Sequence, residues 1–166
     1  MQTKPKDFWK LFRPSACSLK LGGNSQEEIF DELLEILVKA KVLSADLADP
    51  AKRALTDREQ LASTGVGQNV AIPHVKLKGL EQAVFGLSVH QRGVDWHALD
   101  GEPVTIFFTV LRPEKPGPYH DPDRHRELMG WIASLAREPD FRRFAMHVSN
   151  RTELVDLVKE MSARIG

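Results

Sequence analysis

The residue types that can do chemistry gather in one stretch of the chain. At residues 63–67 the sequence Ser-Thr-Gly-Val-Gly follows a helical pattern, and a short apolar run then ends at Pro73 and His74. Glycines there permit a positive φ and let another group approach the backbone closely. Pro73 has no N–H to donate, so strand pairing is expected to end where the imidazole of His74 projects. A loop with free N–H groups beside that imidazole predicts an anion site at His74.

Taken alone, this pattern also fits a second interpretation. A single histidine after a strand is commonly a structural or surface residue, and Gly-x-Gly turns are frequent. The turn at 65–67 matches neither the Walker A motif nor the Rossmann dinucleotide fingerprint. The residues by themselves therefore leave both an anion site and a structural histidine open.

The composition indicates a neutral globular protein. The 166 residues include 23 Lys plus Arg and 23 Asp plus Glu, with 42% hydrophobic residues, which fits one domain with a sizeable core. A nucleic-acid binder or a polybasic membrane-surface protein needs excess positive charge, so neither is expected. No apolar run approaches the roughly 20 residues of a transmembrane helix, and no secretory signal is visible. We expect a cytoplasmic protein without stable membrane insertion.

The single cysteine, Cys17, makes an intramolecular disulfide and a multi-thiolate zinc site impossible. No spacing among the six histidines favours a zinc site either. We therefore expect no metal, and the sequence shows no motif for another cofactor.

Hydrophobic periodicity predicts an α/β fold, a small mixed β-sheet sandwiched by helices. A helix begins at Ser25, which forms a capping box with Glu28, and a second helical stretch covers about 45–62 with an interruption near Pro50. The strand-like segments are 70–72, 83–90 and 104–111, with an edge strand at 93–96. The almost wholly apolar segment 104–111 predicts a central strand buried on both faces.

The last third of the chain predicts three helices after a proline-rich loop at 113–123. Asp121 and Pro122 form an N-cap and first-turn pair that opens a helix running to Ala136. A short helix at 141–146 follows, and Asn150 caps the final one. The predicted core face of the first of these helices consists of Leu128, Met129, Ile132, Leu135 and Ala136.

Residues 1–17 are predicted to form an N-terminal arm, with the main domain at 18–166. The apolar side chains of the arm share one face of a short helix that Pro14 ends, and they are Phe8, Trp9, Leu11 and Phe12. One interpretation is that this face packs on the body of the protein. The other is that it docks to a partner or to a membrane surface.

The whole block from Arg58 to His74 resembles a known family signature. It reads Arg-Glu-x-x-x-Ser-Thr-Gly-Val-Gly-x-x-Val-Ala-Ile-Pro-His. This is similar to the signature of enzyme IIA domains of the mannitol/fructose type, components of the bacterial phosphoenolpyruvate:sugar phosphotransferase system that include the nitrogen-regulatory IIA proteins. The resemblance runs from about Ser18 to the C-terminus and includes a helix with His125-Arg-Glu-Leu near its start.

The resemblance implies roles for three residues. His74 matches the phosphoryl acceptor, His125 the second functional histidine, and Arg58 the arginine of the Arg-Glu pair. Arg58 has a permanently charged, planar guanidinium suited to phosphate oxygens. The alternative role for Arg58 is a salt bridge on the helix surface. Neutral donors for a phosphate are expected at Thr64, Gly65 and Gly67. Phosphoryl transfer of this kind depends on positioning and charge stabilisation, so neither a metal nor an acid–base dyad is expected.

Three features depart from the family pattern. Asn69 stands where glycine is common, although asparagine tolerates the left-handed conformation. Arg126 follows His125 where an apolar residue is usual. The loop 113–124 is long and contains His120, so the second histidine is His125, His120 or neither.

The implied function is a histidine phosphocarrier that accepts a phosphoryl group from the HPr carrier. A free-standing, regulatory protein of the nitrogen type is favoured, because the chain has no membrane domain and Cys17 lies in the arm rather than in a cysteine-type IIB loop. One alternative is a IIA component that passes phosphate to a separate IIB of a fructose/mannitol-type permease. A second is a IIA-like interaction module that binds regulated protein targets without phosphotransfer.

Overall fold

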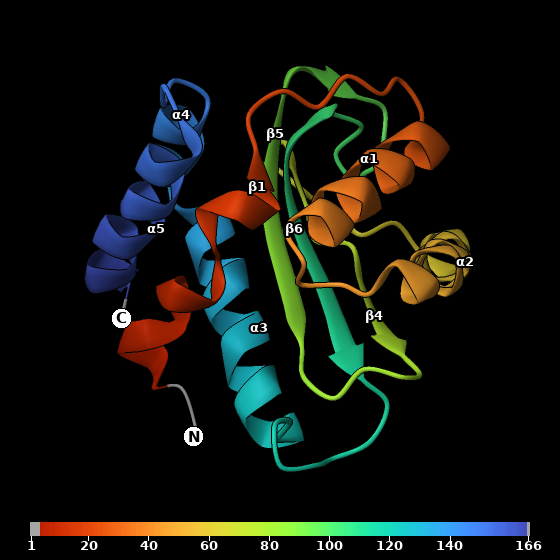
Figure 1. Ribbon diagram of the computed structural model, residues 1–166. Coiled ribbons are helices and arrows are strands. Elements are labelled where there is room, and N and C mark those ends of the chain that lie inside the picture. Colours follow the sequence, from red (N-terminus) through yellow and green to blue (C-terminus); the bar gives the residue numbers. More distant parts are fainter. Residues whose placement is uncertain (1–3, 166) are drawn as a thin grey trace.

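A mixed β-sheet lies between two layers of helices in the computed structural model, which describes residues 4–165 (Figure 1). Helices α1 and α2 cover one face of the sheet, and α3, α4 and α5 cover the other together with the N-terminal segment. The α/β class and the sandwich of a small mixed sheet between helices are confirmed.

Within residues 4–165 the sheet has six strands in the order β1-β5-β6-β3-β2, and β4 also pairs with β6. The strands are β1 Cys17–Ser18, β2 Gly65–Gly67, β3 Val70–Ala71, β4 His74–Leu77, β5 Val84–Val94 and β6 Val104–Pro113. Strand β6 pairs antiparallel with β5 along one edge and parallel with β3 and β4 along the other. The predicted central strand, buried on both faces, is therefore confirmed.

The segment before the candidate histidine differs from the prediction, because His74 begins a strand instead of ending one. Strands β3 and β4 are two parts of one extended segment, interrupted at Ile72 and Pro73. Pro73 cannot donate a hydrogen bond, but its carbonyl still accepts one from the N–H of Val110 at 2.9 Å. Pairing with β6 therefore resumes at once, with His74 opposite Val110.

Two further strand predictions are corrected. The glycine turn is part of a short strand, β2, which pairs antiparallel with β3 through an irregular register between Gly65 and Gly67. The predicted edge strand at 93–96 does not exist separately, because Gly93 and Val94 end the long strand β5.

The helices are α1 Gln26–Lys39, α2 Ala48–Leu61, α3 Pro122–Arg137, α4 Pro139–Ala145 and α5 Arg151–Ile165. Three predicted N-caps are confirmed: Ser25 accepts from the N–H of Glu28, Asp121 from that of Asp123, and Asn150 from that of Glu153. Within residues 4–165, no helix is both long enough and apolar enough to span a membrane.

The predicted interruption of the second helix near Pro50 is wrong, because α2 runs through this proline. It lies in the first turn of α2, after the 3-10 helix η3 (Ala45–Leu47). A proline is tolerated there, because an N–H in the first turn has no partner within the helix. On α3, the buried face includes Trp131 where the prediction has Met129, which is only half-buried.

The N-terminal segment forms two 3-10 helices, η1 (Pro5–Leu11) and η2 (Pro14–Ala16), and packs on the body. Phe8 and Phe12 are each 1% exposed, and both contact Trp131 with ring centroids 5.8 Å and 6.0 Å away. The interpretation that this face packs on the body is confirmed. Phe8 and Phe12 are therefore not available to a docking partner, whereas Trp9 and Leu11 are half-buried against the same core.

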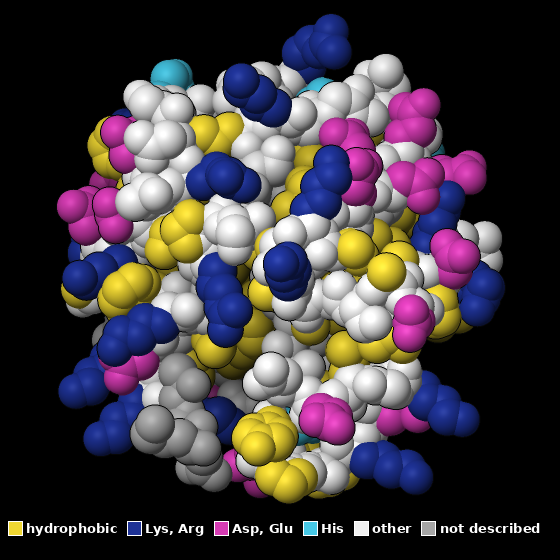
Figure 2. Space-filling view, in the orientation of Figure 1, with side chains coloured by type: hydrophobic (Ala, Val, Ile, Leu, Met, Phe, Trp, Pro, Cys, Tyr) yellow, Lys and Arg dark blue, Asp and Glu magenta, His cyan; other side chains and the backbone are white. Residues whose placement is uncertain are grey.

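The charges are unevenly spread although their sum is zero. On the face shown in Figure 2, Lys and Arg side chains gather over the middle of the molecule, while Asp and Glu side chains gather over the region of α1. A neutral chain can therefore carry a local pocket of one sign.

Candidate functional site

The structure brings His74, His125 and Arg58 to one cavity of about 200 Å³. The three side chains come from β4, α3 and α2, so three separate elements build the site. Every charged side chain in the lining is basic, and the lining consists of Arg58, His74, Val75, Lys76, Val110, Arg112 and His125. The cavity is therefore chemically suited to an anion.

The register of β4 against β6 sets the sheet side of the cavity. His74 pairs with Val110, and Lys76 pairs with Arg112. Residues two apart on a strand point to the same face, so these four side chains lie side by side on one face of the sheet. That face is the one covered by α3, because Val110 belongs to the same buried cluster as the α3 residues. His125, in the first turn of α3, therefore faces it.

One ring nitrogen of His74 is held by the backbone. Its Nδ1 lies 2.6 Å from the carbonyl oxygen of Ile72, just before Pro73. A carbonyl only accepts hydrogen bonds, so Nδ1 carries the proton in the neutral ring. The lone pair then resides on Nε2, which is the nitrogen able to attack phosphorus.

His125 is kept uncharged by its surroundings. Burial lowers the pKa of His125 to about 4, and the positive charge of Arg112 and the imidazoles of His120 and His74 act in the same direction. The ring is therefore neutral near pH 7 and can donate one hydrogen bond. A phosphoryl dianion on His74 would act in the opposite direction to Arg112 and favour protonation of His125.

Arg112 and Lys76 are cations of the cavity that the sequence patterns do not single out. Arg112 is the first charged residue after the apolar run 104–111, at the end of the central strand. That position is a signal, because polar residues at the end of a buried strand gather at one edge of the sheet. Lys76 follows His74 by two residues, which places it on the same face only once β4 is known to be a strand.

Arg58 lines the cavity and also caps the C-terminal end of its own helix. Its Nη1 donates a hydrogen bond to the carbonyl of Ala62 at 2.7 Å, just beyond the last residue of α2. The guanidinium has five N–H donors, so one such bond leaves donors for an anion in the cavity it lines.

The Thr-Gly-x-Gly segment does not line this cavity. The Thr64 hydroxyl donates to Oε1 of Glu59 at 2.5 Å and accepts from Nε1 of Trp96 at 3.1 Å, and Thr64 is only 3% exposed. A Cβ on Gly65 would lie 2.7 Å from that of Ala98, and Gly67 has a φ of +93°. The structure gives these residues a part in the turn, and their contact with phosphate stays a prediction.

His120 lies beside His125 but outside the cavity that contains His74. The two rings pack edge to face with centroids 5.5 Å apart, and His120 is buried. Its Nε2 has no hydrogen-bond partner among residues 4–165. The pKa of His120 is lowered, mainly by burial and also by the charge of Arg112, and Asp121 offsets only part of this effect. Of the two candidates for the second histidine, His125 is the one that shares the cavity with His74.

Comparison with protein families agrees with this geometry. Residues 10–161 match the family described as phosphoenolpyruvate-dependent sugar phosphotransferase system, EIIA 2. The chain belongs to this EIIA 2 family.

Members of both the nitrogen and the sugar branch are similar to this EIIA 2 chain. A nitrogen regulatory protein of Bradyrhizobium diazoefficiens is 35% identical over 80% of this chain and 82% of its own. A mannitol-specific phosphotransferase enzyme IIA component of Staphylococcus aureus is 36% identical over 93% of this chain and 99% of its own. The chain spans only 23% of the fructose-specific EIIABC component of Bacillus subtilis, at 24% identity.

Among solved structures, the crystal structure of nitrogen regulatory protein IIA-Ntr from Neisseria meningitidis superposes with a TM-score of 0.75. That protein is 28% identical, and the match covers 90% of this chain and 97% of the other. The fold is therefore that of IIA proteins.

Proposed function

We propose that this EIIA 2 protein is a histidine phosphocarrier that accepts a phosphoryl group on Nε2 of His74 from the phosphohistidine of an HPr-type donor. One observation carries the proposal. His74 lines a cavity whose charged side chains are all basic, and its Nδ1 lies 2.6 Å from the carbonyl of Ile72, which leaves the lone pair on Nε2. Family membership fits this chemistry.

The transfer step balances without a further reactant. Nε2 of His74 attacks phosphorus in line with the donor's N–P bond, the new N–P bond forms as the old one breaks, and the electron pair returns to the donor's imidazole. The proton stays on Nδ1 of His74, bonded to the Ile72 carbonyl, so the positive charge that develops on the ring is stabilised at 2.6 Å.

The lining residues stabilise the charge on the transferred group. Arg58, Lys76 and Arg112 supply three positive charges around a dianionic phosphoryl group. His125 donates one neutral hydrogen bond before transfer, and becomes easier to protonate once the phosphoryl group is in place. Preorganised charges of this kind act without reorganisation at the moment of transfer.

The favoured role is that of a free-standing regulatory protein of the nitrogen type, whose phosphorylation state selects protein targets. Its likeness to nitrogen regulatory proteins in sequence and in structure supports this role. The alternative is a IIA component that passes phosphate on to a IIB domain, which the similarity to a mannitol-specific IIA over nearly its whole length supports.

The test is incubation with phosphoenolpyruvate, enzyme I and HPr, followed by detection of acid-labile phosphate on the chain. We expect label on the unsubstituted protein and on His97→Asn, an exposed histidine control, but none on His74→Ala. Absence of label on the unsubstituted protein would contradict the proposal and favour an interaction module without phosphotransfer. Transfer onward to a IIB domain then separates the sugar role from the regulatory one.

A further inference from the structure

A second cavity, of about 260 Å³, adjoins the phosphoryl cavity and shares His125 with it. It lies between η1, the start of β5, the loop 113–121 and the first turns of α3. The arm and this loop are the two segments that the proposed function does not use. Both segments contribute side chains to one cavity beside the reactive histidines, which suggests that this cavity has a function of its own.

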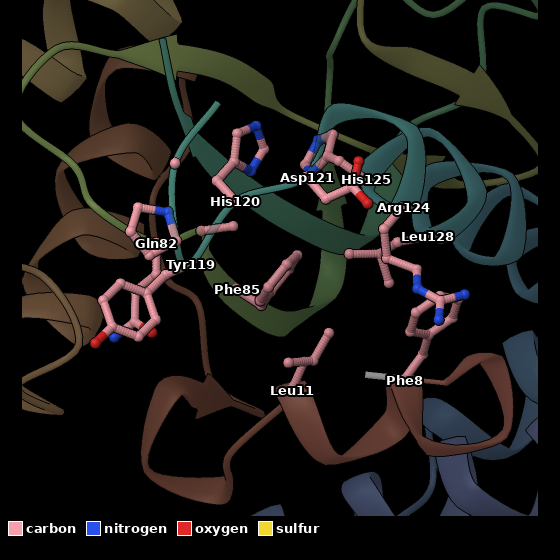
Figure 3. A pocket seen from close by; sticks show the side chains of 13 residues that line it. Phe8, Leu11, Gln82, Phe85, Tyr119, His120, Asp121, Arg124, His125 and Leu128 are labelled. Atoms are coloured by element: carbon pink, nitrogen blue, oxygen red, sulfur yellow. The ribbon is translucent and has the colours of Figure 1, made fainter. Parts of the chain in front are cut away.

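One side of this second cavity is apolar. Figure 3 places Leu11 and Phe8 across the cavity from His120 and His125, with Phe85 between them. Aromatic and aliphatic walls of this kind accept a ring-sized apolar group, and a cavity of about 150 Å³ already holds benzene. The volume of about 260 Å³ therefore suits one ring with a short substituent.

The second cavity is also lined by hydrogen-bond donors. Arg124 lines it with a side chain that is only 27% exposed, and one of its nitrogens donates to Glu127 at 2.8 Å. The guanidinium keeps further N–H groups, and each neutral imidazole keeps one. The carboxylate in the lining, Asp121, accepts from the N–H of Asp123 at the start of α3. This donor set matches a carboxylate on the ligand.

We propose that the second cavity binds a small carboxylate with an apolar ring, and that its occupation changes phosphoryl transfer at His74 through the shared side chain of His125. The binding stands on the cavity alone, while the effect on transfer rests on the proposed function.

The coupling follows from the charged groups that line the two cavities with His125. The positive ones are Arg112 on β6, Arg58 on α2, Lys76 on β4 and Arg124 on α3. Asp121, just before α3, is negative, and the imidazoles of His74 and His120 also face the ring. Burial and Arg112 lower the pKa of His125. A carboxylate in the second cavity adds a negative charge beside this ring, so it raises the affinity of His125 for a proton. Because linkage is reciprocal, protonation of His125 and binding of the carboxylate favour each other.

Binding is tested by NMR on the whole, unphosphorylated chain titrated with phenylacetate. We expect saturable shifts of the ring resonances of His120 and His125, much weaker shifts with phenylacetamide, which lacks the charge, and none with acetate, which lacks the ring. Arg124→Gln should weaken binding about tenfold because it removes the charged donor. Arg126→Gln is the matched control, since Arg126 is 82% exposed and lies outside the cavity.

A second variant tests the cavity by filling it. Ala83 lines the second cavity, and Ala83→Leu should abolish the shifts while the circular dichroism spectrum stays unchanged. Equal weakening by Arg124→Gln and Arg126→Gln, or no saturable shift at millimolar phenylacetate, would overturn the site.

The coupling is tested separately by the rate of phosphoryl transfer from HPr. Saturating phenylacetate should change this rate about fivefold in the unsubstituted protein and leave it unchanged in Ala83→Leu, whose cavity is filled. Binding without any phosphorylation would refute the proposed function but keep the site. Phosphorylation without binding would refute the site and keep the function.

Discussion

The Nδ1 atom of His74 lies 2.6 Å from the carbonyl oxygen of Ile72, across the proline that separates the two residues. This contact fixes which ring nitrogen carries the proton. The break in pairing at Pro73 and the immediate return of pairing at His74 put both groups within reach of each other. A backbone feature thus determines the chemistry of a side chain.

Acidification should destabilise the fold through His125. Burial lowers the pKa of His125 to about 4, from an ordinary value of 6.5. Between about pH 6.5 and pH 4, His125 is therefore protonated in the unfolded chain but neutral in the folded chain. The free energy of unfolding should therefore fall as the pH drops from about 6.5 towards 4. Urea unfolding across this range should show a shallower fall in His125→Gln than in Arg126→Gln. Parallel pH profiles in the two variants would contradict the burial argument.

Arg112 should matter for transfer although it does not bond to His74. Arg112→Gln removes one of the three permanent cations of the cavity, so the rate of phosphorylation by HPr should fall about 10- to 100-fold. The same change should raise the pKa of His125, because Arg112 lowers it. Arg92→Gln, on the exposed end of β5, is the control and should retain the rate. An unchanged rate in Arg112→Gln would show that its charge does not reach the transferred group.

Glu59 should prove to be a stability residue of the site loop. Its carboxylate accepts both the N–H and the hydroxyl of Thr64, and the residue is 8% exposed. Glu59→Gln places an amide donor against one of these donors, so the free energy of unfolding should fall by about 1–3 kcal/mol. Glu81→Gln, an exposed glutamate, should change it by less than about 0.5 kcal/mol in the same urea titration. Equal effects would mean that the loop does not depend on this carboxylate.

The N-terminal segment should contribute to the stability of the fold, because its aromatic side chains are part of the core. Phe12 is 1% exposed and contacts Phe85, Phe108 and Trp131, so Phe12→Ala should cost about 3–5 kcal/mol. Lys6→Ala, on the exposed side of the same segment, is the control for chemical denaturation. A stability like that of the unsubstituted protein in Phe12→Ala would restore the docking interpretation.

Local signals predict the helices well because capping and amphipathicity are local. The caps at Ser25, Asp121 and Asn150 lie where the sequence places them. The short strands β2 and β4 escape prediction because each has only three or four residues and is held by pairing with distant segments. No local pattern encodes such pairing.

The candidate site divides in the same way. The histidines and Arg58 come from a motif, and the fold brings them to one cavity. The position of Arg112 beside His74 could not be predicted, because it depends on the register between β4 and β6. The engagement of Thr64 with Glu59 and Trp96 depends on a residue about thirty positions away, which spacing along the chain does not reveal.

The most direct test of the central claim locates the phosphoryl group on the ring. The chain, labelled with nitrogen-15 in its histidines, is phosphorylated by phosphoenolpyruvate, enzyme I and HPr and then examined by NMR. We predict coupling of phosphorus to Nε2 of His74, with the proton retained on Nδ1, because Nδ1 is bonded to the Ile72 carbonyl. Phosphorus on Nδ1 of His74, or on any other histidine, would contradict the account.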